Sequence, residues 1–216
     1  MPSWAWRVID QLVQVRGGRG YETAASLKAR GEKPVPVEQV MRDLRVNRIF
    51  EGSSEIMQLM IAREAVAEHL KAAGDLLAPG GDLKMKADAA LHAGVFYSKW
   101  LPQLPVGEGQ HPRSYDEFDD LASYLRYVAR SSRKLARSTF HGMGRWQAKL
   151  EQQQCRIVDI GAELFAIAAT VCYADTIERE HPERKSEALE LAELFCEQAK
   201  ERAETLFNEL WSNPRR

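Results

Sequence analysis

The chain has 216 residues, of which 44% are hydrophobic and 28% charged, with a formal net charge of -1. This composition is typical of an ordinary globular protein that can bury a core, and it gives no overall attraction to nucleic acid or to an anionic membrane. Three widely spaced cysteines, Cys155, Cys172 and Cys196, include no CxxC pair. They argue against a disulfide framework and favour a reducing compartment.

The sequence shows neither a signal peptide nor a clear membrane-spanning segment. The N-terminus lacks the basic segment and unbroken apolar stretch of a signal peptide. The most apolar stretch, residues 157–173, carries Asp159 and Glu163, so we expect a buried core helix rather than a membrane span. An apolar helical face begins almost at once, at Trp4, without an N-cap, and we therefore expect the natural fold to begin upstream.

The periodicity predicts an all-α protein, since no run of alternating β-branched residues occurs. The first helix is expected over residues 4–16, and Gly17 and Gly18 end it. A polar loop is expected over residues 21–36, followed by a helix from Pro36 to about Ile49. After a break at residues 51–54, capped by Ser53 or Ser54, the next helix runs to Gly74.

A boundary is predicted at residues 78–82, so that residues 1–77 and 83–212 form two domains. The second is expected to be an up-and-down helical bundle, with helical segments at about 83–104, 115–151, 154–179 and 183–211. Residues 121–150 contain seven basic side chains and no acidic ones, whereas residues 175–209 contain 11 acidic and five basic ones. We expect these two segments to neutralise each other, although the basic one alone would also suit a membrane surface.

Two short blocks carry the candidate chemistry: QVRGGRGY at residues 14–21 and RDLRVNRIFEGSSEIMQLMIAR at residues 42–63. Glu51 lies at a helix break beside Gly52 and next to the apolar Ile49 and Phe50. Apolar surroundings would raise the proton affinity of its carboxylate, as a general base requires, and the glycine would leave room for a substrate. The residues alone equally allow Glu51 to be an acid that assists the next helix, and Gly17–Gly18 to be a plain helix end. Arg42 and Asp43 are expected to form an ion pair.

Both blocks resemble the C-terminal helical domain of the flavin-dependent acyl-CoA dehydrogenases, in order, spacing and residue type. The resemblance implies that Glu51 removes the α-proton of a fatty acyl-CoA thioester while hydride leaves the β-carbon for FAD, giving a trans-2-enoyl-CoA. Gly52 would line the acyl-CoA site. Residues proposed to contact FAD are Gln14, Val15, Arg16, Gly17 and Gly18, on the FAD of a neighbouring subunit, and Ser53, Ser54 and Glu55. An electron-transfer flavoprotein-type acceptor is the implied redox partner.

The sequence departs from the family pattern in two places. Residues 23–33 lengthen the loop after the glycine block, and the family's upstream domains, which hold the flavin, have no counterpart here. We therefore expect the chain to be inactive alone and to act with the missing dehydrogenase domains or as a homo-oligomer. Residues 83–212 resemble, in length and helicity only, the helical extension of the very-long-chain type.

The alternative is a non-catalytic helical interaction module that retains the family motif. No metal site and no nucleic-acid partner are expected, because the five histidines are isolated and no binding signature accompanies the basic segment. The predicted location is the cytoplasm or the inner face of a membrane.

Overall fold

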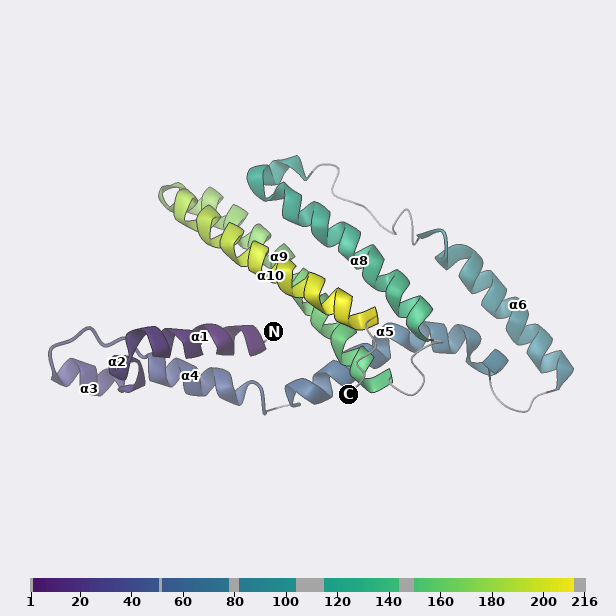
Figure 1. The fold of residues 1–216 in the computed structure, drawn as a ribbon, viewed down its shortest axis with the longest axis horizontal. Coiled ribbons are helices and arrows are strands. Elements are labelled where there is room, and N and C mark those ends of the chain that lie inside the picture. Colours follow the sequence, from purple (N-terminus) through teal and green to yellow (C-terminus); the bar gives the residue numbers. More distant parts are fainter. Residues whose placement is uncertain (1, 51, 78–81, 104–114, 144–149, 212–216) are drawn as a thin grey trace. The chain divides into compact units, whose positions relative to one another are not determined.

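The computed structural model describes residues 2–50, 52–77, 82–103, 115–143 and 150–211. Every regular element in these ranges is a helix, which confirms the predicted all-α class (Figure 1). The chain divides into two compact units, Met1–Gln58 and Leu59–Arg216. This division falls inside the helix α5 (Ser54–Leu77), whereas the predicted boundary at residues 78–82 lies almost wholly outside the described residues and stays a prediction.

The first unit contains four helices before α5: α1 (Pro2–Arg16), α2 (Gly18–Tyr21), α3 (Ala24–Ala29) and α4 (Val37–Val46). The helices α1 and α4 pack against each other. Arg45 on α4 lies over the ring of Trp6 on α1, 5.3 Å from its centroid. The buried apolar side chains of this unit are few among the described residues: Ile9, Leu27 and Val37. The small core holds together α1, α2 and α4, which carry the glycine block and the beginning of the second block.

The expected polar loop at residues 21–36 contains a helix instead, α3. Thr23 is its N-cap and accepts a hydrogen bond from the backbone N–H of Ser26 at 3.2 Å. Leu27 is fully buried, and it anchors one face of the short helix. Leu27 is the single large apolar residue of α3, and one such residue cannot produce a helical periodicity in the sequence. The loop prediction was therefore wrong for these residues.

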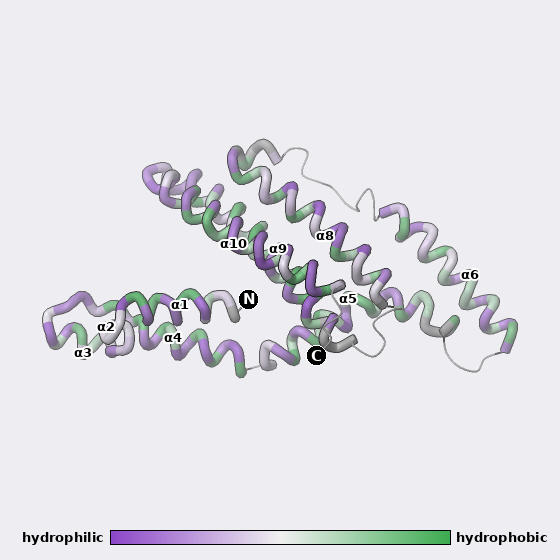
Figure 2. Tube along the Cα trace, viewed as in Figure 1, coloured by the Kyte–Doolittle hydropathy of each residue, from purple (hydrophilic) through white to green (hydrophobic). Residues whose placement is uncertain are grey.

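The second unit contains the rest of α5, a further helix α6, and a bundle. Its elements are α6 (Leu83–Trp100), the 3-10 helix η1 (Asp116–Leu121), α8 (Ala122–Met143), α9 (Leu150–Glu180), η2 (Pro182–Arg184) and α10 (Lys185–Trp211). In Figure 1, α8, α9 and α10 run side by side, and η2 joins α9 to α10 at the predicted break. Hydrophilic and hydrophobic residues are interspersed along the helices in Figure 2, as expected where each helix buries one face.

The core of the second unit lies between α8, α9 and α10. Its most deeply buried side chains include Ile160, Ile167 and Val171 of α9 and Phe207 of α10. By length and composition alone, the stretch Cys155–Glu180 of α9 is apolar enough to cross a membrane. In the structure, however, α9 buries one face in the core, and its Glu163 pairs with Arg202 at 3.3 Å. Both features are typical of a core helix, in which a buried charge is paired.

An ion pair and two tyrosine hydrogen bonds join the described parts of the basic and acidic segments, and the ion pair is of the predicted kind. Lys134 on α8 lies 3.6 Å from Glu204 on α10, in an ion pair that is about half exposed. Tyr124 and Tyr127 on α8 donate hydrogen bonds of 3.0 Å to Glu197 and Glu204. Because exposed ion pairs contribute only about 0–1 kcal/mol, the apolar core must dominate the stability of the bundle.

Candidate functional site

The glycine block forms a tight corner between α1 and α2. Gly17 has a φ of 58°, in the left-handed region that favours glycine. Its N–H donates to the carbonyl of Gln14 at 3.2 Å, and its own carbonyl accepts from Gly20 at 2.9 Å. A Cβ at Gly17 or Gly18 would meet no atom within 4 Å. The corner therefore leaves open space beside its backbone.

Gly20 has a role that the sequence did not indicate. A Cβ at this position would lie 2.7 Å from the carbonyl oxygen of Val13 and 2.8 Å from its Cα. The α2 backbone thus approaches α1 as closely as only glycine permits. Three glycines in four residues look alike in sequence, but only Gly20 is required for contact and only Gly17 for its φ.

The second block places a turn between α4 and α5. Gly52 has a φ of 113°, and a Cβ there would lie 3.2 Å from the sulfur of Met57. Ser53 caps α5, because its hydroxyl accepts from the N–H of Ile56 at 3.4 Å. The N–H of Ser54 donates back across the turn to the carbonyl of Arg48 at 3.3 Å. The predicted serine cap is confirmed, at Ser53.

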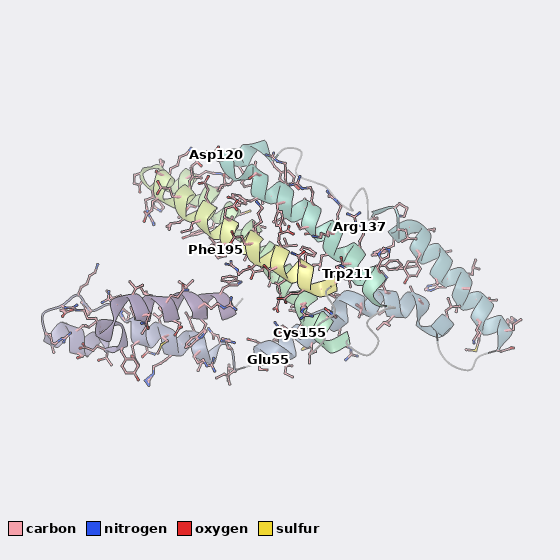
Figure 3. All side chains as sticks on the ribbon, viewed as in Figure 1. Glu55, Asp120, Arg137, Cys155, Phe195 and Trp211 are labelled. Atoms are coloured by element: carbon pink, nitrogen blue, oxygen red, sulfur yellow. The ribbon has the colours of Figure 1, made fainter. Side chains whose placement is uncertain are left out.

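Glu55 lies in the first turn of α5, as Figure 3 shows. Its pKa is lowered, mainly because its own backbone N–H hydrogen-bonds to the charged carboxylate. The Ser53 hydroxyl adds to this effect, and Arg48 and Arg45 add smaller electrostatic ones. Glu55 is therefore held ionised near neutral pH and is a poor proton acceptor.

Glu51 lies outside the described residues. Its neighbours Ile49 and Phe50 were expected to surround the carboxylate with apolar groups, but they are 63% and 66% exposed. These two side chains are therefore mostly open to solvent, and the apolar environment of the Glu51 carboxylate stays a prediction.

The helix before the turn also corrects the predicted ion pair. Arg42 pairs with Glu38 at 3.2 Å, and Asp43 accepts a hydrogen bond from Gln39 at 2.8 Å. Residues four apart lie on the same face of a helix, whereas neighbours such as Arg42 and Asp43 diverge by about 100°. The two side chains therefore stabilise α4 separately.

Comparison with known proteins gives consistent matches. Residues 1–66 match the profile "Acyl-CoA dehydrogenase, C-terminal domain", a range that contains both motif blocks. "Probable acyl-CoA dehydrogenase FadE10" from Mycobacterium tuberculosis and from Mycobacterium bovis is 63% identical over 207 residues, which are 94% of this chain and 32% of the relative. The chain is therefore similar to acyl-CoA dehydrogenases along most of its length and carries the family's C-terminal domain pattern over residues 1–66.

A more distant relative matches a shorter part of the chain. The human "Very long-chain specific acyl-CoA dehydrogenase, mitochondrial" is 43% identical over 58 residues, which are 27% of this chain and 7% of that protein. The chain spans about a third of the length of the FadE10 relatives. No solved structure was found to match it.

Acyl-CoA dehydrogenases are generally FAD-dependent, and the described residues of the second block fit a polar ligand. The Ser54 hydroxyl is buried without a hydrogen-bond partner among the described residues, as is Nε of Arg48. Buried polar groups are normally paired. An orphaned hydroxyl at a helix N-terminus is therefore compatible with hydrogen bonding to a cofactor.

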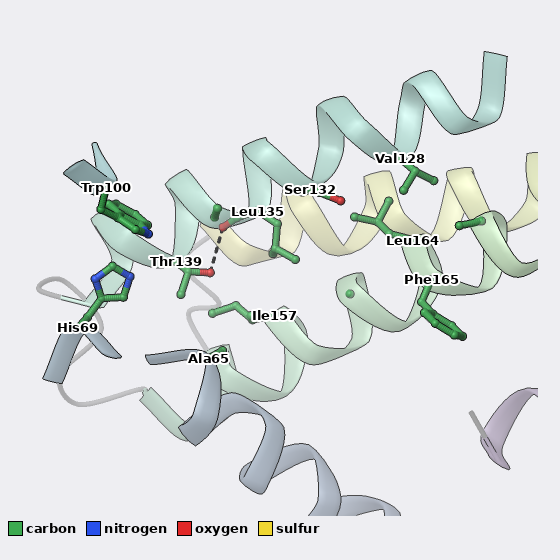
Figure 4. A pocket seen from close by; sticks show the side chains of 13 residues that line it. Ala65, His69, Trp100, Val128, Ser132, Leu135, Thr139, Ile157, Leu164 and Phe165 are labelled. Atoms are coloured by element: carbon green, nitrogen blue, oxygen red, sulfur yellow. Dashed lines mark hydrogen bonds between the residues drawn. The ribbon is translucent and has the colours of Figure 1, made fainter. Parts of the chain in front are cut away.

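The second unit contains an apolar groove of about 600 Å³. Its walls come from α8 and α9, through residues such as Val128, Leu135 and Leu164, and Figure 4 shows His69 and Trp100 near one end. The hydroxyl of Thr139 faces this space but donates to the carbonyl of Leu135 at 2.9 Å. The groove could not be predicted from sequence patterns, because its lining residues are spread over four helices.

Within the described parts of the chain, no group of three His, Cys, Asp or Glu side chains could hold a metal ion. The three cysteines are free, and Cys196 is buried. Burial raises the pKa of the Cys196 thiol to about 12. It is therefore an inert core residue.

Proposed function

We propose that the chain supplies the catalytic base and part of the cofactor-binding surface of a flavin-dependent acyl-CoA dehydrogenase. The observation that carries the proposal is the match of residues 1–66 to the family's C-terminal domain, since this range includes Glu51 and both glycine-bearing turns. The proposed reaction is α,β-dehydrogenation of a fatty acyl-CoA thioester to the trans-2-enoyl-CoA, as in fatty acid β-oxidation.

Glu51 is the proposed acceptor of the α-proton. The motif contains a second carboxylate, Glu55, whose lowered pKa and place in the first turn of α5 make it the weaker base of the two. Gly52 supports the assignment through its φ of 113°, which lets the chain turn sharply next to position 51, and it is proposed to line the acyl-CoA site. The backbone N–H of Glu51 is proposed to hydrogen-bond to the thioester carbonyl as negative charge develops on it.

Two sets of residues are proposed to hold FAD, which when bound would accept the hydride. Ser53, Ser54 and Glu55 would contact the FAD of the same subunit, and the unpaired Ser54 hydroxyl supports this. Gln14, Val15, Arg16, Gly17 and Gly18 would contact the FAD of a neighbouring subunit. The open space at Gly17 and Gly18 supports close approach of a ligand to the backbone.

The chain is proposed to act only together with dehydrogenase domains that bind the rest of the flavin, since it spans about a third of the FadE10 length. Its proposed partners are these domains, in the same or another polypeptide, further copies of the chain, and an electron-transfer flavoprotein-type acceptor. Cytoplasmic location, or binding at the inner face of a membrane, also stays a proposal.

Replacement of the base tests the proposal. The chain is combined with the flavin-binding domains of a FadE10-type relative, and reduction of bound flavin by acyl-CoA is followed by absorbance under anaerobic conditions. Glu51→Gln should leave flavin binding intact and lower the reduction rate by at least about 10³-fold, as expected for loss of a general base. Glu64→Gln, an exposed position on α5, is the matched control and should reduce flavin normally.

Near wild-type reduction by Glu51→Gln would place the base elsewhere. A second candidate function, a non-catalytic helical interaction module, is favoured by one observation: the main core lies in α8–α10, beyond the matched residues 1–66. In that case, the chain would stay colourless in every mixture with flavin and flavin-binding domains.

A further inference from the structure

His69 on α5 lies among four aromatic rings from two other helices. Its ring centroid is 5.8 Å from Phe96, 5.8 Å from Tyr97 and 4.5 Å from Trp100, all on α6. It is also 5.7 Å from Phe140 on α8. Tyr97 and Trp100 themselves contact Phe140, at 5.5 and 5.1 Å. This aromatic cluster joins three helices of the second unit.

Among the described residues, little else connects α6 to the bundle. Extensive helix packing in this unit involves α8, α9, α10 and the two 3-10 helices, and α6 takes part in none of it. Most of the large apolar side chains of α6 face solvent, including Leu83, Met85, Leu91 and Val95. The position of α6 therefore depends on the aromatic cluster.

His69 is poorly suited to carry a charge in this cluster. Its Nδ1 atom is buried and has no hydrogen-bond partner within the described residues. Burial lowers the pKa of His69 below its ordinary value of 6.5, and the charge of Glu68 opposes this only in part. Stacking on Tyr97 would favour a cation, but protonation would leave a partly buried charged ring whose Nδ1–H has no acceptor among the described residues.

Other charged and titratable groups lie on the helices around His69 and could also respond to pH. They are Glu68 and Lys71 on α5, which form an ion pair at 2.7 Å, Tyr97, Lys99 and His92 on α6, Arg137 and His141 on α8, and Arg156 on α9, which pairs with Glu209. Of these, only His92 and His141 are histidines, and both are exposed. His92 serves as the control away from the cluster, and His141, whose ring centroid lies 5.6 Å from that of Phe140, tests a histidine at its edge.

We propose that His69 and its four aromatic neighbours form a pH-sensitive latch, which holds α6 on α8 and opens when His69 is protonated. The direction follows from linkage. A histidine whose folded pKa is lowered stabilises the packed state above its unfolded pKa, and this stabilisation is lost as pH falls through about 6.5. Opening would also free the end of the groove that His69 and Trp100 line.

The test uses the full chain and two readouts. The tryptophans are replaced by 5-fluorotryptophan, and the fluorine NMR signal of Trp100 is assigned by its loss in Trp100→Phe. Hydrogen exchange of residues 83–100 gives protection factors corrected for intrinsic exchange. Between about pH 7.5 and pH 5.5, the Trp100 signal should shift, and protection of α6 should fall by up to about tenfold, as one pH unit below the free pKa allows.

The variants separate His69 from the other histidines. His69→Phe, which keeps a ring in the cluster, should remove both pH effects, and His69→Gln provides a neutral alternative should that variant not fold. His92→Gln and His141→Gln should retain them. Constant α6 protection across this pH range in the wild type, or unchanged pH dependence in both His69 variants, would overturn the latch.

Discussion

At the scale of single residues, the motif glycines have separate physical tasks. Gly17 and Gly52 occupy positive φ values that side chains rarely adopt, and Gly20 permits close backbone contact with Val13. Gly18 meets neither constraint. Fold stability alone does not explain why residue 18 is a glycine, and we attribute this glycine to the proposed FAD contact. The sequence motif is thus part fold and part proposed function.

Alanine substitutions at Gly20 and Gly18 should distinguish these tasks. Gly20→Ala forces a Cβ to within 2.7 Å of the Val13 carbonyl and should destabilise the first unit by about 1–3 kcal/mol, as overpacking does. Gly18→Ala has open space and should be neutral or slightly stabilising. Urea unfolding followed by circular dichroism measures both. Equal effects of the two substitutions would show that the close approach at Gly20 is not maintained.

At the scale of elements, the long helices were predictable and the short ones were not. Apolar periodicity and breaks at glycine or proline predict the helices α1, α4, α6, α9 and α10. In a long amphipathic segment, the spacing of the apolar residues indicates which face is buried. Helix α3 depends on one cap and one buried leucine, which only the tertiary contact reveals. The candidate site was predicted from its motif, but the exposure of Ile49 and Phe50 and the close contact at Gly20 required coordinates.

The cap at Thr23 should therefore control α3. Thr23→Ala removes the acceptor for the Ser26 N–H and should lower the stability of the first unit by about 1 kcal/mol. Thr23→Ser keeps the hydroxyl and should restore most of it. Amide exchange of Ser26 and Leu27 provides a local readout. If Thr23→Ser were as unstable as Thr23→Ala, the hydroxyl would not be the cause.

At the scale of the whole molecule, apolar burial is unevenly distributed. The first unit buries only Ile9, Leu27 and Val37 among its described large side chains, and it exposes Val8, Leu12 and Val15 along α1. The bundle buries a continuous core through α8, α9 and α10. The motif-bearing unit therefore has the weaker core, consistent with a segment that needs further dehydrogenase surface to cover it.

This difference predicts two levels of protection in native-state hydrogen exchange. Amides of α9 and α10 should exchange only through global unfolding of the bundle, whereas those of α1 and α4 should exchange through smaller openings. Addition of the flavin-binding domains should slow exchange in α1 and α4 and leave α9 and α10 unchanged. Equal protection of both units in the isolated chain would contradict the difference in cores.

Glu51 is proposed to remove a proton from the carbon next to a thioester, and exchange of this α-proton with solvent is a direct measure of that role. The chain, combined with FAD and flavin-binding domains, is incubated in D₂O with an acyl-CoA whose β-carbon carries no transferable hydride, and deuterium at the α-carbon is measured by mass spectrometry. We expect rapid exchange with the wild type and an exchange rate at least about 10³-fold lower in Glu51→Gln. Glu64→Gln should exchange at the wild-type rate. Exchange at the wild-type rate in Glu51→Gln would contradict the proposed role of Glu51.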